Sequence, residues 1–354
     1  MLLLIIACQS KLQNDTSEEL LPLTPFDSIG PFAVGHHQIE HTYIPFENQP
    51  QRTIIIDVWY PTNDQSGEEA LYLYGTDDKA LEGATPAQAI HPLGYPIHLH
   101  SHGYQGWGAT SAFLMRYFAS HGWISVAPNH TNNLLGDHQD PLATAHFIHR
   151  PMDLSQSLDV VEGLDLWPSS LDMNNVLMSG HSFGASYSTW AIAGASYDQV
   201  EESCRTGEGL EQGGCSEQEL SILTSGSLFD QRIKAAIPLA GTIRKTFFGD
   251  TGYQSVTHPI LFISGTQDNH DSAQAHFDEI NNMDFSWLSL SGGCHQTFAL
   301  GQCTSLDVEL GFSIVQTYSL AFARKHIINQ SNDDIDGLLS GQEAPWAEAV
   351  LQLK

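Results

Sequence analysis

The sequence predicts an α/β fold built on a mostly parallel sheet. Short apolar runs alternate along the middle of the chain with segments of helical periodicity. Continuous apolar runs are typical of strands buried on both faces of a parallel sheet, and the helices supply the crossovers that parallel strands need. The 354 residues suffice for one large domain, and a 41% hydrophobic fraction excludes a disordered chain.

Seven segments are expected to be strands because they are continuously apolar or rich in β-branched and aromatic residues. In chain order they are 53–60, 97–102, 124–128, 176–179, 233–239, 260–264 and 285–290. No helix separates the segment 32–45 from the first of them, which predicts an antiparallel pair at the sheet edge. The expected helices are 109–120, 151–166, one directly after Ser182, 272–281 and 310–327, and an acidic tail or helix is expected at 331–354.

Residues 197–230 interrupt this alternation because they are polar and rich in glycine. We interpret them as an insertion above the sheet and a candidate lid. Four cysteines form two close pairs in the sequence, and the most economical of the possible pairings joins Cys204 to Cys215 and Cys294 to Cys303. Neither pair has the C-x-x-C spacing of a zinc or redox site. The sequence therefore predicts an insertion held by a disulfide.

The chain begins with an apolar run, MLLLIIA, followed by Cys8 and a polar segment. The run is too short to span a bilayer and resembles the apolar part of a secretory signal. The segment that ends at Cys8 also resembles a bacterial lipobox, in which the cysteine is lipidated. We therefore expect a signal peptide at 1–7, a lipoprotein tether at 8–27 and a folded domain at 28–330. Such a protein is exported, and is periplasmic, anchored to the outer membrane or secreted.

The formal net charge of −28 limits the possible partners. Nucleic acids and anionic membrane surfaces are recognised through Lys and Arg, of which this chain has 13 against 41 Asp and Glu. We expect a monomer with a solvated acidic surface, no nucleic-acid partner, and membrane contact only through the N-terminal anchor.

An expected strand and an expected helix are joined by the motif Gly180-His181-Ser182-Phe183-Gly184. G-x-S-x-G at a strand-to-helix turn is the nucleophile elbow of serine hydrolases. The turn is too tight for side chains at the flanking positions, which explains both glycines. The N–H groups at the start of the next helix point at developing negative charge. We predict that Ser182 is a nucleophile.

A serine hydroxyl needs a base, and in such enzymes the acid and then the base follow the nucleophile along the chain. Asp268 follows the sixth expected strand, where an orienting carboxylate belongs, and it is the preferred acid. Asp271 is the alternative, although an N-cap also explains it. His295 lies on a Gly-rich loop after the last expected strand and is the predicted base, with His270 as its nearby competitor. A disulfide from the neighbouring cysteine would hold that loop still.

An oxyanion hole requires two backbone N–H groups. One is expected from Phe183, the residue after the nucleophile, and the other from Tyr104, in the loop after the strand 97–102. Trp107 and His181 are expected to line the substrate pocket beside these groups. The aromatic residues favour an apolar or aromatic ester as substrate.

His98, His100 and His102 alternate along one expected strand and therefore share a face, which resembles a set of metal ligands. The chain has neither an H-x-H-x-D-H nor an H-E-x-x-H motif. A strand inside a parallel sheet is also a poor position for an open metal site. We expect no metal and no cofactor, and we expect His102 to brace the oxyanion loop.

These motifs belong to a wider resemblance that covers residues 28–328. The chain is similar to the α/β-hydrolase family of bacterial predicted dienelactone hydrolases and platelet-activating-factor acetylhydrolases, and more distantly to cutinases and polyester hydrolases. Further matching segments are Gly30 to Gly35, Asp57 to Pro61, Ser101 to Gly103, Ala127 to His130 and Arg150 to Asp153. The resemblance implies an α/β-hydrolase fold, and it implies site roles for Ser182, Asp268, His295, Tyr104 and Phe183. True dienelactone hydrolases use a cysteine nucleophile, so the serine here argues against their substrate.

The sequence therefore predicts a serine carboxylic-ester hydrolase that works through an acyl-enzyme on a small, apolar or aromatic ester. Two alternatives stay open. One keeps the chemistry and changes the substrate, either to a phospholipid, as in a phospholipase A2-type reaction, or to a polyester. The other is a binding lipoprotein on a hydrolase scaffold that does not catalyse.

Overall fold

The computed structural model describes residues 25–269 and 272–354, and within them a sheet of eleven strands runs in the order β11-β10-β9-β8-β7-β5-β6-β2-β1-β4-β3. The strands are β1 (Ala33–Tyr43), β2 (Arg52–Thr62), β3 (Glu69–Tyr72), β4 (Gly75–Glu82), β5 (Tyr95–Ser101), β6 (Ile124–Asn129), β7 (Leu171–His181), β8 (Ile233–Leu239), β9 (Ile260–Gly265), β10 (Phe285–Leu290) and β11 (Ala349–Leu353).

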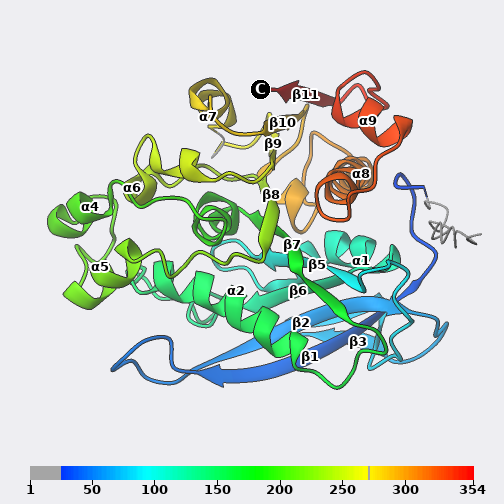
Figure 1. Cartoon of the computed structure of the whole chain (residues 1–354), viewed down its shortest axis with the longest axis horizontal. Helices are drawn as coiled ribbons and strands as arrows, with labels where there is room; N and C mark the ends of the chain where they lie inside the picture. Colours follow the sequence, from blue (N-terminus) through cyan, green and yellow to red (C-terminus); the bar gives the residue numbers. More distant parts are fainter. Residues whose placement is uncertain (1–24, 270–271) are drawn as a thin grey trace, which may run out of the picture.

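The middle of the sheet is parallel. Strands β6, β5, β7, β8, β9 and β10 each run parallel to their neighbours within this set. Strands β1 and β2 are antiparallel and lie toward one edge, at the bottom of Figure 1, as the sequence predicted. The prediction of a mostly parallel sheet is confirmed.

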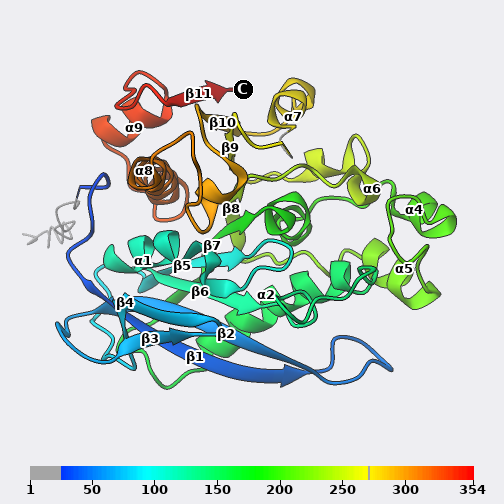
Figure 2. The same cartoon turned by 180° about the vertical axis from the view of Figure 1, so that it is seen from behind.

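Helices cover both faces of the sheet. The helices of the described residues are α1 (Ala112–Ser120), α2 (His146–Glu162), α3 (Thr189–Ile192), α4 (Val200–Thr206), α5 (Glu217–Thr224), α6 (Lys245–Phe248), α7 (Ala273–Glu279), α8 (Val308–His326) and α9 (Asp333–Leu339). Helices α1 and α8 pack together on one face, whereas α2 and α3 pack on the other. Helices α4, α5 and α6 gather at one side of the molecule in both views (Figures 1 and 2).

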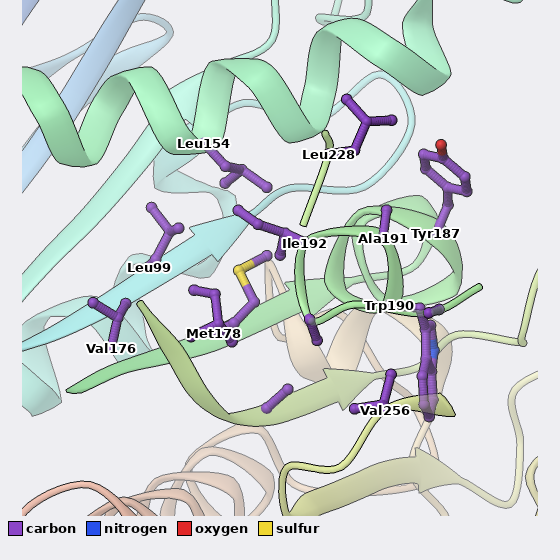
Figure 3. Packing of buried hydrophobic residues seen from close by; sticks show 14 of the residues in the cluster. Leu99, Leu154, Val176, Met178, Tyr187, Trp190, Ala191, Ile192, Leu228 and Val256 are labelled. Carbon is purple, nitrogen blue, oxygen red and sulfur yellow. The ribbon is translucent and has the colours of Figure 1, made fainter. Parts of the chain in front are cut away.

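The central strands are apolar on both faces because successive side chains point in opposite directions. Leu99, Val176 and Met178 belong to the core cluster beneath α2, where Leu154 faces the sheet (Figure 3). Leu177, between two of them in the sequence, packs in the opposite cluster beneath α1 and α8. Full burial of each such side chain contributes about 1.5–3 kcal/mol. The parallel strands therefore form a rigid platform for the loops at their carboxyl ends.

Helix α2 begins at His146, before the predicted start at Pro151. Proline has no N–H to donate to the carbonyl four residues earlier, so the carbonyl of Phe147 loses its partner in the helix. The hydroxyl of Tyr187 donates to that carbonyl at 2.6 Å. A donor from another part of the chain therefore allows the helix to continue through the proline.

Substitution Tyr187→Phe should lower the free energy of unfolding by about 1–3 kcal/mol, because it leaves the buried Phe147 carbonyl unsatisfied while the ring still packs. Urea unfolding measures the loss. Tyr197→Phe is the matched control, since among the described residues the Tyr197 hydroxyl forms a hydrogen bond only with the Tyr187 hydroxyl, at 2.8 Å. A loss no larger than that of the control would contradict this role.

The sequence did not predict β3, β4 or β11. The predicted tail at 331–354 contains helix α9 and strand β11, and β11 extends the sheet by pairing antiparallel with β10. These short edge segments become strands through pairing with a neighbour. Their own composition does not predict a strand; β4, for example, carries two adjacent aspartates.

Both predicted cysteine pairs are present, with Cα–Cα distances of 4.8 Å for Cys204–Cys215 and 5.5 Å for Cys294–Cys303. Two disulfides indicate an oxidising, exported compartment. The predicted signal peptide and Cys8 lie outside the described residues. Within the part of the chain that the structure describes, no helix is long and apolar enough to cross a membrane.

Candidate active site

A sharp bend places Ser182 between strand β7 and the π-helical turn η2 (Gly184–Ser188). Ser182 has a φ of 54°, in the left-handed region that side chains other than glycine rarely adopt. A Cβ on Gly184 would overlap the carbonyl oxygen of Ser101, and a Cβ on Gly180 would lie 2.6 Å from the carbonyl carbon of Gly184. Backbone packing on both sides of the serine therefore requires the two glycines of the motif.

Ser182, His295 and Asp268 form a continuous chain of hydrogen bonds. The Oγ of Ser182 lies 2.8 Å from Nε2 of His295, and Nδ1 of His295 lies 2.7 Å from Oδ2 of Asp268. The Asp268 side chain is fully buried, whereas the His295 side chain is 24% exposed. The carboxylate accepts the proton on Nδ1, so the lone pair of Nε2 faces the hydroxyl of Ser182 and can accept its proton. This is the arrangement that general-base activation of a serine needs.

The loops that carry Asp268 and His295 are packed backbone to backbone. Asp268 follows β9, and His295 follows β10, the neighbouring parallel strand. The N–H of Gln267 donates to the carbonyl of Gly293 at 2.8 Å, and a Cβ on Gly265 would overlap that same carbonyl. One disulfide also closes the histidine loop. The separation of Asp268 and His295 is therefore fixed by backbone contacts.

The two alternatives for these roles, His270 and Asp271, lie outside the described residues. The hydrogen bond to His295 is made by Asp268. The geometry therefore favours Asp268, the preferred acid, at the position of the orienting carboxylate.

Two backbone N–H groups are available beside the serine. In the described part of the chain, nothing accepts a hydrogen bond from the N–H of Phe183 or of Tyr104. The loop that carries Tyr104 passes close to Ser182, because a Cβ on Gly103 would lie 3.2 Å from the Cβ of Ser182. Both residues line the same cavity as Ser182. This placement suits the two donors of an oxyanion hole.

Buried polar side chains hold the loop of Gly103 in place. Nδ1 of His102 donates to the Gly103 carbonyl at 2.7 Å, and its Nε2 accepts the N–H of His130 at 3.0 Å. Burial and the nearby Arg150 guanidinium hold the pKa of His102 well below its ordinary value, so the ring is neutral. Arg150 donates to the His102 carbonyl and to the hydroxyl of Ser101. The expected bracing by His102 is thus part of a larger network.

Sequence reasoning missed the other half of this network. The carboxylate of Asp153 accepts from Arg52 at 2.7 Å and lies 2.8 Å from Nδ1 of His130. Burial alone would raise the pKa of Asp153, but the Arg52 guanidinium holds it well below the ordinary value. The resemblance included Asp153, but only the fold brings it to Arg52, a hundred residues away.

The serine opens into a cavity of about 510 Å³. Its wall comes in part from the loop of Tyr104, from the segment 240–246 after β8, and from Glu211 in the segment 197–230. The lining residues are Tyr104, Leu142, Ser182, Phe183, Ser186, Glu211, Ala240, Gly241, Thr242, Ile243, Arg244, Lys245, Thr246 and His295. The segment 240–246 could not be predicted as part of the site, because no motif marks it.

Trp107 and His181 do not line this cavity, contrary to the prediction. The ring of Trp107 packs against Tyr74, with ring centroids 5.1 Å apart. His181 is buried behind the base, where its Nε2 donates to the His295 carbonyl at 3.0 Å. Burial lowers the pKa of His181 to about 4, so it supports the histidine loop as a neutral ring.

His98 and His100 of β5 each make a hydrogen bond within the protein. Both His98 and His100 contact the hydroxyl of Ser179, at 2.7 and 2.8 Å. Among the described residues, no group of three or more His, Cys, Asp or Glu side chains is placed to hold a metal ion.

No protein-family model and no curated protein matches the chain. Among solved structures it is similar to a ferulic acid esterase from Streptomyces cinnamoneus, with a TM-score of 0.61 and 18% sequence identity. The match covers 93% of this chain and 98% of that one. The chain therefore shares the fold of this esterase over almost its whole length.

Proposed function

We propose that the protein is a serine carboxylic-ester hydrolase. The observation that carries the proposal is the hydrogen-bonded chain from Ser182 through His295 to Asp268, at 2.8 and 2.7 Å. The fold shared with a ferulic acid esterase supports an ester as substrate. The resemblance to the platelet-activating-factor acetylhydrolase-like family, a lipid anchor at Cys8 and a monomeric state are part of the same proposal.

The geometry supports the following mechanism. Nε2 of His295 takes the hydroxyl proton as Ser182 attacks the ester carbonyl, and the N–H groups of Phe183 and Tyr104 stabilise the oxyanion. The protonated ring, oriented by Asp268, then donates its proton to the leaving alcohol. Water repeats the sequence on the acyl-enzyme and releases the acid.

A fluorophosphonate probe tests the proposal, because it reacts covalently only with an activated serine. We expect stoichiometric labelling, which peptide mass spectrometry assigns to Ser182. Ser186→Ala is the matched control, since Ser186 also lines the cavity and its hydroxyl donates to the Ser182 carbonyl at 2.8 Å. This variant should still be labelled. Absence of labelling in the wild-type protein would favour the binding lipoprotein, and turnover of small esters, phospholipids and polyester films would separate the substrate classes.

A further inference from the structure

Arg244 is a charged group in the cavity that the mechanism does not use. It follows β8, lines the cavity together with Ser182 and His295, and is half-buried. Its backbone N–H donates to the carbonyl of Ser186 at 3.0 Å, which fixes the start of the side chain. No described residue accepts a hydrogen bond from its guanidinium. Its N–H donors therefore have no hydrogen-bonded partner among the described residues, although the side chain lines the cavity.

Two aromatic rings hold this guanidinium in place. Its Cζ lies 5.4 Å from the ring centroid of Phe147 and 5.3 Å from that of Phe183. Stacking on rings restricts the plane of the guanidinium and leaves its N–H edges free. Phe183 directly follows Ser182, so this contact also holds the guanidinium close to the bend that carries Ser182. The guanidinium is therefore already oriented before a ligand binds, which lowers the entropy cost of binding.

Among the described residues, no carboxylate forms an ion pair with Arg244, although the charge of Glu211 attracts it. Lys245, the other cation of the cavity wall, is paired with Glu279 at 2.8 Å and with Asp250 at 3.0 Å. Glu211 lines the cavity as well, but its carboxylate accepts the N–H of Leu142 at 2.5 Å and makes no hydrogen bond to the guanidinium. A half-buried cation without a hydrogen-bonded partner is unusual in a chain with 41 acidic residues.

We propose that Arg244 binds an anionic oxygen group, a carboxylate or a phosphate, carried by the same ester that Ser182 attacks. A planar guanidinium matches either group with two parallel hydrogen bonds. This inference rests on the proposed function and narrows its substrate. The enzyme then prefers esters with a free acid group, such as half-esters of dicarboxylic acids or phosphate-bearing esters, over neutral esters of the same shape.

Two matched pairs of esters test this specificity. Monomethyl adipate is compared with dimethyl adipate, and 1-acetylglycerol 3-phosphate with 1-acetylglycerol, by kcat/KM in a pH-stat. The wild-type enzyme should prefer the anionic member of at least one pair, and that pair identifies the group as carboxylate or phosphate. Arg244→Gln should lower the anionic-to-neutral ratio about 10- to 100-fold, and Arg244→Lys should lower it less. Lys245→Met should keep the wild-type ratio, because its charge is already paired.

A binding measurement separates this inference from the proposed function. In the Ser182→Ala variant, calorimetry should detect the preferred anionic ester and not its neutral partner, and adding Arg244→Gln should abolish the binding. Neutral esters turned over without any anionic preference would overturn the anion site and leave the hydrolase intact. A ratio that falls equally in Lys245→Met would also overturn it, since the preference would then reflect general positive potential. Anion binding through Arg244 without turnover of any ester would support the site and refute the hydrolase.

Discussion

Substitution Ser182→Ala is expected to lower kcat for a p-nitrophenyl ester by about 10⁶-fold. The Ser182 hydroxyl is the group that lies 2.8 Å from Nε2 of His295, so its removal leaves the base with no proton to take and the ester with no nucleophile. The oxyanion donors remain, and they alone give a residual rate about 10³–10⁴-fold above that in water. Initial rates against a hydroxide-corrected blank measure the effect.

The fold should survive this change, because alanine keeps the Cβ at the bend and removes only the hydroxyl. Circular dichroism and thermal unfolding of the variant provide the control. Activity within about tenfold of the wild type would mean that another group attacks the ester, and the assignment of the serine would be wrong.

The sharp bend at Ser182 could be predicted from sequence because its requirements are local. The tight turn needs Gly180 and Gly184 whatever the rest of the chain does, and the flanking strand and helix have their own periodicity. The loop carrying His295 was predictable for a related reason, since glycines and a cysteine mark its position after a strand. Both disulfide pairs followed from short separations along the chain.

The rest of the site depends on contacts between distant segments. The cavity wall at 240–246 has no motif, and it lines the site only because β8 lies beside β7. Trp107 is close to the oxyanion loop in sequence, but packing against Tyr74 takes its ring away from the cavity. Helix α2 runs through Pro151 because a distant hydroxyl replaces the missing donor. In each case tertiary packing overrides a rule that holds locally.

Substitution Asp268→Asn is expected to lower kcat by about 10⁴-fold with little change in structure. The carboxylate now accepts the proton on Nδ1 of His295 at 2.7 Å. An asparagine amide in the same place can instead donate to Nδ1, which moves the ring proton to Nε2. Nε2 then faces the Ser182 hydroxyl as a donor and cannot accept its proton. The asparagine thus removes the base while keeping the shape of the site.

Two comparisons make this result specific. Asp268→Ala removes the acceptor without imposing the wrong tautomer, so a loss of kcat of similar or smaller size is expected. Imidazole NMR resonances should show the proton on Nε2 only in the asparagine variant.

Asp271→Asn tests the alternative acid and should change kcat by less than about twofold, because Asp268 makes a hydrogen bond to His295. If Asp271→Asn carried the loss instead, Asp271 and not Asp268 would be the carboxylate that orients the base, and the assignment of the acid would be wrong.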